Sequence, residues 1–203
     1  MPIKSRTVVE RFAWEKTAMI PIAVRRVARK VSALLKDRNI PHALAGGMAV
    51  CLHGYDRMTR DVDIVVEREA KEFIESLGDA KPLYGKVEGL TVKIDKVDVD
   101  FIFPSLGLHS EDITSPDYLV GFPVIKIEPL IAMKMEAGRS QDSADIVALI
   151  KRGKVPIEET FKRLPVQDYD DFKGFIALAD MENKGDSKKA RRMFLALMNK
   201  KHR

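Results

Sequence analysis

Cysteine and tryptophan are nearly absent from this sequence of 203 residues, which contains one of each. The single cysteine, Cys51, excludes an internal disulfide and a cysteine-rich zinc site, and fits a reducing cytoplasm. No apolar run is long enough to cross a bilayer, and the short apolar stretch 18–24 runs into Arg25 and Arg26, unlike a signal peptide. We therefore expect a cytoplasmic protein with no membrane partner.

Internal repeats and low-complexity segments are also lacking. Hydrophobic residues make up 45% of the chain and charged residues 32%, as in an ordinary globular protein, which argues against wholesale disorder. The formal net charge of +5 permits an anionic partner such as a nucleotide or nucleic acid, without requiring one. Basic residues on the predicted helix 21–38 and near 188–192 form either solvated surfaces or docking faces for RNA.

The chain changes character near residue 126. Before it, strand and helix patterns alternate, whereas only helical periodicity follows, so we expect an α+β unit over 1–126 and a helical domain over 127–203. Strands are expected at 40–45, at 62–66, twice within 90–103 with a turn near Asp95 and Lys96, and once within 118–125. Helices are expected at 21–38, 48–53, 69–77, 128–137, 141–151, 156–164, 168–182 and 186–200.

One stretch of the first unit carries the chemistry. Gly46 and Gly47 close an apolar strand, and a short helix follows whose first amides and positive dipole end can face phosphate. Asp61 and Asp63 then open a second apolar strand, and their spacing puts both side chains on one face. Two carboxylates held this close favour a divalent cation between them, although a solvated strand end is the simpler alternative for the pair alone. Together the two elements indicate a site for a metal ion and a triphosphate.

A third carboxylate is expected from the strand 97–103. Asp98 and Asp100 share one of its faces. We favour Asp100, because an apolar run begins directly after it, as after Asp63, while Asp98 remains the rival. Such an aspartate acts either as a general base on an acceptor hydroxyl or as a further metal ligand. Arg57 and Arg60 flank the acidic pair, as phosphate-neutralising or as plain surface residues.

These motifs in this order resemble the nucleotidyltransferase superfamily with the DNA polymerase β-type palm. The segment 129–149, with Lys134, Arg139, Asp142 and Asp145, is similar to the helical segment of AbiEii-type and toxin–antitoxin-type nucleotidyltransferases. The resemblance covers roughly residues 40–150. It implies an α+β fold: a palm-like mixed sheet with flanking helices, followed by a C-terminal helical bundle.

The resemblance also implies an activity and its residues. A nucleoside monophosphate would pass from an NTP to a hydroxyl of a tRNA end, a protein or a small molecule, and an antitoxin partner is expected for some relatives. The implied metal ligands for Mg²⁺, or alternatively Mn²⁺, are Asp61, Asp63 and Asp100, with Asp98 as the rival to Asp100. The implied nucleotide-binding residues are Gly46, Gly47, Met48, Arg60, Lys134 and Asp145.

Met48 departs from the family pattern, in which Ser or Thr often follows the glycine pair. This substitution favours an alternative, a catalytically inactive palm-fold module that binds a partner protein, a nucleotide or RNA. Lys134 also fits a surface lysine with its stem packed on the protein, and Asp142 fits the acidic start of a helix.

Overall fold

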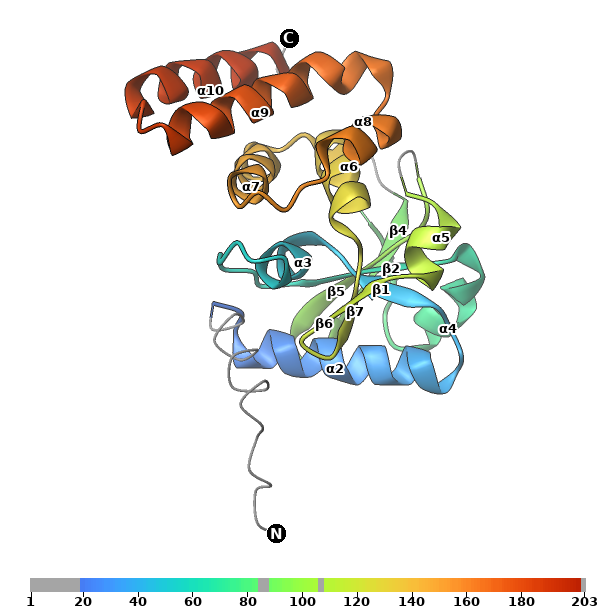
Figure 1. Ribbon diagram of the computed structural model, residues 1–203. Helices are drawn as coiled ribbons and strands as arrows, with labels where there is room; N and C mark the ends of the chain where they lie inside the picture. The colour runs from blue at the N-terminus through green and yellow to red at the C-terminus, as the bar shows by residue number, and fades with distance from the viewer. Residues whose placement is uncertain (1–18, 84–87, 106–107, 202–203) are drawn as a thin grey trace. The chain divides into compact units, whose positions relative to one another are not determined.

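The computed structural model describes residues 19–83, 88–105 and 108–201 (Figure 1). The chain divides into two compact units. Of the described residues, the first contains 19–83, 88–104 and 110–125, and the second contains 105, 108–109 and 126–201. Residues 1–18 of the expected first domain lie outside the described part of the chain.

The first unit is built on a seven-stranded mixed sheet in the order β3-β4-β5-β2-β1-β7-β6. At its centre β2 runs antiparallel to β1 and parallel to β5, so the end of β1 and the starts of β2 and β5 lie at one edge. The strands are β1 (His42–Leu44), β2 (Val62–Val66), β3 (Lys81–Pro82), β4 (Gly89–Ile94), β5 (Val97–Ile102), β6 (Asp117–Leu119) and β7 (Phe122–Val124). The predicted turn between β4 and β5 is confirmed: Asp95 and Lys96 both have positive φ, as a two-residue hairpin loop requires.

Helices cover this sheet. Helix α2 (Ile22–Asp37) contacts β2 and β5 and runs along one face of the sheet (Figure 1). It buries Val24, Val27, Val31 and Leu35, the stripe that a helix of period 3.6 presents to a core. The other helices that the structure describes in this unit are α3 (Gly46–Leu52), the 3-10 turn η1 (Arg68–Ala70), α4 (Lys71–Ser76) and α5 (Ser110–Thr114).

The second unit consists of helices in its described part. Phe172, Phe175 and Leu178 of α9 are buried, as are Leu130 of α6 and Leu149 of α7. Its elements are α6 (Ile127–Ala137), α7 (Ser140–Lys151), α8 (Ile157–Arg163), the 3-10 turn η2 (Val166–Asp168), α9 (Tyr169–Asn183) and α10 (Ser187–Lys201). The predicted fold class, a mixed sheet with flanking helices followed by C-terminal helices, is confirmed.

The prediction for residues 105–125 was wrong in detail. Residues 110–114 form the short helix α5, which was not among the expected helices, and two strands, β6 and β7, replace the single expected strand. The turn between them places Val120 and Gly121 at positive φ, 56° and 79°. A β-branched residue such as Val120 rarely adopts that conformation, so the local sequence does not predict a turn here.

Candidate active site

The glycine pair lies against the acidic strand β2. The Ala45 N–H donates to the Asp63 carbonyl at 2.9 Å, which holds the end of β1 beside β2. Gly46 has φ of +54°, and a methyl group on its Cα would overlap the Asp63 carboxylate. A Cβ on Gly47 would lie 2.6 Å from the Thr59 hydroxyl oxygen and 2.7 Å from Arg57 Nη2. Position 46 therefore needs glycine, and a Cβ at position 47 would force the Thr59 and Arg57 side chains to shift.

Asp63 and Asp100 lie side by side at the edge of the sheet. They are direct Cα partners in the parallel pairing of β2 and β5, which places both side chains on one face. Both residues are half-buried. The Thr91 hydroxyl of β4 donates to Asp100 Oδ1 at 2.7 Å and fixes the orientation of that carboxylate. Asp63 thus meets the glycine turn on one side and Asp100 on the other.

Asp61 precedes β2 and is exposed. The buried Thr59 hydroxyl donates to Asp61 Oδ1 at 2.8 Å. Since Thr59 also lies against Gly47, one hydroxyl connects the glycine turn with the first carboxylate of the Asp-x-Asp pair.

Asp98 has a different partner. It is paired in register with Lys93 of β4, and the Lys93 ammonium lies 2.5 Å from Asp98 Oδ1. The Asp98 side chain is 52% exposed, so this is a surface ion pair. The geometry therefore supports Asp100 over Asp98 as the third carboxylate.

The carboxylates of Asp61, Asp63 and Asp100 are the kind of ligand that the hard cations Mg²⁺ and Mn²⁺ prefer. Thr59 and Thr91 orient two of these three carboxylates. Within the described ranges, however, no three or more His, Cys, Asp or Glu side chains form a group that could hold a metal ion. The assignment of Asp61, Asp63 and Asp100 as metal ligands stays a prediction.

Met48 contributes its backbone to this region. Its side chain is fully buried. The hydrogen bond from Ala49 N–H to the Ala45 carbonyl starts α3, so the N–H groups of Gly46, Gly47 and Met48 have no partner within the helix. Arg60 is exposed, and Arg57 donates from Nη1 to the Met58 carbonyl at 3.0 Å. Phosphate binding at this turn would thus use backbone amides and not a hydroxyl at position 48.

Lys134, Asp142 and Asp145 form a buried network within the second unit. The Lys134 ammonium donates to Asp142 Oδ1 at 3.0 Å and to Asp145 Oδ2 at 2.6 Å, and all three side chains are at most 4% exposed. Arg139 Nε donates to Asp142 Oδ2 at 2.7 Å, and Gln141 donates to Asp145 Oδ1 at 3.1 Å.

Asp142 is ionised in this network. Burial by itself raises the pKa of its carboxyl, but the hydrogen bond from Arg139 and the positive charge of Lys134 outweigh burial and hold the pKa below its ordinary value. Through these contacts Lys134 of α6 and Asp145 of α7 join the two helices. Their implied roles at the triphosphate stay predictions.

Thr59 and Thr91 were missed by reasoning from the sequence. The signal for Thr91 was present: a hairpin turning at Asp95 and Lys96 pairs residue 91 with residue 100. His53 Nε2 lies 2.8 Å from the Ile125 carbonyl oxygen, and Cys51 is buried.

No family model matches the sequence, and no curated protein matches it either. Solved structures do. A candidate nucleotidyltransferase from Thermotoga maritima is 18% identical, with a TM-score of 0.46, over 66% of this chain and 96% of its own. An antigenic nucleotidyltransferase-like protein from Paracoccidioides brasiliensis is 15% identical, with a TM-score of 0.48, over 84% and 93%. The structure of ANT(2")-Ia with adenylyl-2"-tobramycin is 16% identical, with a TM-score of 0.42, over 86% and 97%.

Because these identities lie below 25% and the TM-scores below 0.5, the likeness to these structures does not define a function for the chain. The AbiEii-like subtype stays a prediction. Across the described ranges, no helix has the length and apolar character needed to span a membrane.

Proposed function

We propose that this chain is a nucleotidyltransferase that moves a nucleoside monophosphate from an NTP to a hydroxyl acceptor. The observation that carries the proposal is the position of the Asp63 carboxylate, which lies against Gly46 and beside Asp100. In this proposal the backbone amides of the glycine turn bind phosphate, next to a pair of carboxylates at the same sheet edge.

The reaction forms a bond between the acceptor oxygen and the α-phosphorus, and breaks the bond between that phosphorus and the bridging oxygen to the β-phosphate. Pyrophosphate leaves with that bridging oxygen, and the acceptor proton passes to a base, for which Asp100 is the candidate. The amides of the glycine turn bind phosphate oxygens. A bound Mg²⁺ or Mn²⁺, held by Asp61, Asp63 and Asp100, would neutralise phosphate charge. Thr91 positions the Asp100 carboxylate.

Transfer of label from the α-phosphate tests the proposal. Each NTP, labelled at either the α- or the γ-phosphate, is incubated with the protein, Mg²⁺ or Mn²⁺, and tRNA, cell protein or small hydroxylated metabolites, and pyrophosphate release is measured in parallel. We expect α-label and no γ-label in one acceptor pool. Asp63→Asn and Asp100→Asn should abolish transfer while leaving the circular dichroism spectrum unchanged.

Asp98→Asn is the discriminating variant. Because Lys93 holds Asp98 in a surface pair, we expect this variant to retain activity. Loss of activity in Asp98→Asn with retention in Asp100→Asn would assign the third carboxylate to Asp98. Absence of α-label from every pool, or full activity of Asp63→Asn, would contradict the transferase proposal.

A non-catalytic palm-fold module is the second candidate, and the buried methionine at position 48 favours it. It predicts that nucleotide or partner binding survives in Asp63→Asn. A toxin–antitoxin role is tested separately. Expression of the chain in bacteria should arrest growth, and expression of Asp63→Asn should not. Co-expression of the neighbouring gene should relieve the arrest.

A further inference from the structure

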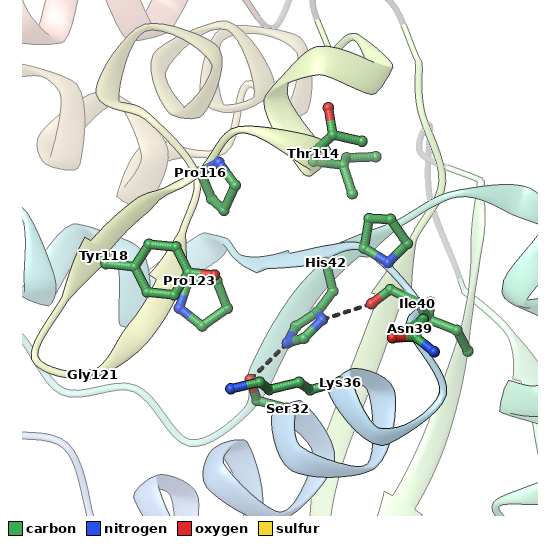
Figure 2. Close-up of a pocket in the computed structure, with 12 residues that line it drawn as sticks. Ser32, Lys36, Asn39, Ile40, His42, Thr114, Pro116, Tyr118, Gly121 and Pro123 are labelled. Carbon is green, nitrogen blue, oxygen red and sulfur yellow. Dashed lines mark hydrogen bonds between the residues drawn. The ribbon is translucent and has the colours of Figure 1, made fainter.

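A pocket of about 360 Å³ lies at the end of β1 that is remote from Gly46. Ser32, Lys36 and Asn39 line it from α2 and the turn that follows, His42 lines it from β1, and Tyr118 and Pro123 line it from β6 and β7 (Figure 2). Its volume is within the range of small-molecule sites. All of these residues belong to the first unit.

The floor of the pocket has a defined donor and acceptor pattern. His42 is 8% exposed, and its Nδ1 lies 3.0 Å from the Ile40 carbonyl. A carbonyl only accepts, so Nδ1 carries the proton. Burial lowers the pKa of the His42 ring, against the opposing effect of the bond to Ile40, so the ring is neutral near pH 7.

Neutral His42 fixes the direction of the next hydrogen bond. Its Nε2 is an acceptor, and the Ser32 hydroxyl, 2.6 Å away, donates to it. Because the Ser32 hydroxyl donates its proton to His42, the Ser32 oxygen is left as a hydrogen-bond acceptor at the pocket floor. A ligand that places an N–H group there would complete the pattern.

The pocket is positive. Among the described residues that line it, Lys36 is the one basic side chain besides the neutral His42, and none is acidic. One ammonium group matches the single negative charge of a monocarboxylate.

The walls favour a flat ring. Tyr118 and Pro123 are opposed in the pairing of β6 and β7, and Figure 2 shows their rings beside one another. Two further prolines, Pro41 and Pro116, also line the pocket. Tyr118 is 77% exposed, which leaves a large aromatic surface for a ligand to cover.

We propose that this pocket binds a heteroaromatic monocarboxylate with a ring N–H. The ring lies against Tyr118 and Pro123, the N–H donates to Ser32 Oγ, and the carboxylate pairs with Lys36. The site is separate from the proposed transferase site, since it lies at the opposite end of β1, and it does not depend on that activity.

Titration of the ¹⁵N-labelled full chain with indole-3-carboxylate and with pyrrole-2-carboxylate tests the proposal by NMR. We expect saturable shifts of the amides around Ser32, His42 and Gly121 with at least one of the two acids. Three comparisons isolate the contacts. The neutral carboxamides should bind about fivefold more weakly, Lys36→Met should remove that preference, and N-methylation of the ring should weaken binding several-fold.

Two variants serve as matched controls. Tyr118→Ala should weaken the acid and the amide alike, because it removes ring contact and no charge. Arg26→Met removes one exposed positive charge from α2 outside the pocket and should leave the affinity unchanged. Absence of saturable shifts with both acids, equal affinity for acid and amide, or equal losses in Arg26→Met and Lys36→Met would overturn the proposal.

Discussion

Substitution of Lys134 by methionine separates a structural from a nucleotide-binding role for this lysine. Its ammonium lies 2.6 Å from Asp145 and 3.0 Å from Asp142, and the side chains of all three residues are at most 4% exposed. Arg139, whose side chain is 76% exposed, still pairs with Asp142 in the variant. Asp145 loses the ammonium and, at 0% exposure, cannot turn to solvent. Lys134→Met therefore removes an ammonium group from a buried carboxylate.

The penalty has a ceiling set by protonation. A buried aspartate that loses its cation can take up a proton, which costs about 1.36 kcal/mol for each pH unit above its ordinary pKa of about 3.9. At pH 7 this amounts to about 4 kcal/mol, within the range of about 3–5 kcal/mol for removing one partner of a buried pair. At pH 5 the same cost is about 1.5 kcal/mol. We expect the loss in unfolding free energy to shrink accordingly between the two pH values.

Urea denaturation followed by circular dichroism at both pH values measures this loss, and hydrogen exchange of the α6 and α7 amides localises it. Lys151→Met is the matched control, because it breaks a half-exposed pair with Glu182 in the same unit and should cost under about 1 kcal/mol at either pH. A loss for Lys134→Met below about 1 kcal/mol at pH 7, or one that is equal at both pH values, would refute the reasoning. A raised KM for NTP with unchanged stability would instead support the nucleotide role.

Three further predictions follow from named contacts. Gly46→Ala should lower transfer activity at least about tenfold, because the new methyl group displaces the adjacent Asp63 carboxylate. Gly153→Ala is the control: it has a similar positive φ but open space around it, so it should affect stability alone. Pyrophosphate release measures the activity of each variant, and denaturation measures its stability. Thr91→Val should lower activity about tenfold with the fold intact, since Asp100 loses a charge-assisted bond; equal rates would remove Thr91 from the site. Because burial depresses the pKa of His42, its contribution to stability is complete above about pH 6.5 and falls as pH drops through the folded-state value; denaturation of His42→Gln should show a weaker dependence in this window.

Local patterns sufficed for most elements around the candidate site. The alternation over 90–103 and the turn at Asp95 and Lys96 predicted the hairpin, and the apolar run 62–66 matches β2 residue for residue. Period and turn chemistry act over a few residues, so they are visible in the sequence. At Val120 the local signal opposed the structure, because the two-residue turn and the pairing of β6 with β7 hold a β-branched residue at positive φ.

The arrangement of the carboxylates could not be predicted from local sequence patterns alone. Asp98 and Asp100 share a face of β5, so periodicity cannot choose between them. The register of β4 distinguishes their surroundings, since it sets Lys93 opposite Asp98 and Thr91 opposite Asp100. The parallel partnership of Asp63 with Asp100 joins strands far apart in the chain, and it follows from tertiary packing alone.

The two acidic clusters differ in what holds them. Threonine hydroxyls orient Asp61 and Asp100, and a hydroxyl fixes a carboxylate without adding positive charge. The carboxylates of Asp142 and Asp145 instead contact the Lys134 ammonium, which offsets their charge inside the protein. A site that must attract a cation and repeatedly release an anionic product needs oriented carboxylates that keep their charge, whereas a helix interface needs that charge neutralised. If the proposed function holds, the hydroxyl donors to Asp61 and Asp100 fit a ligand-binding role, and the ammonium between Asp142 and Asp145 fits a stabilising one.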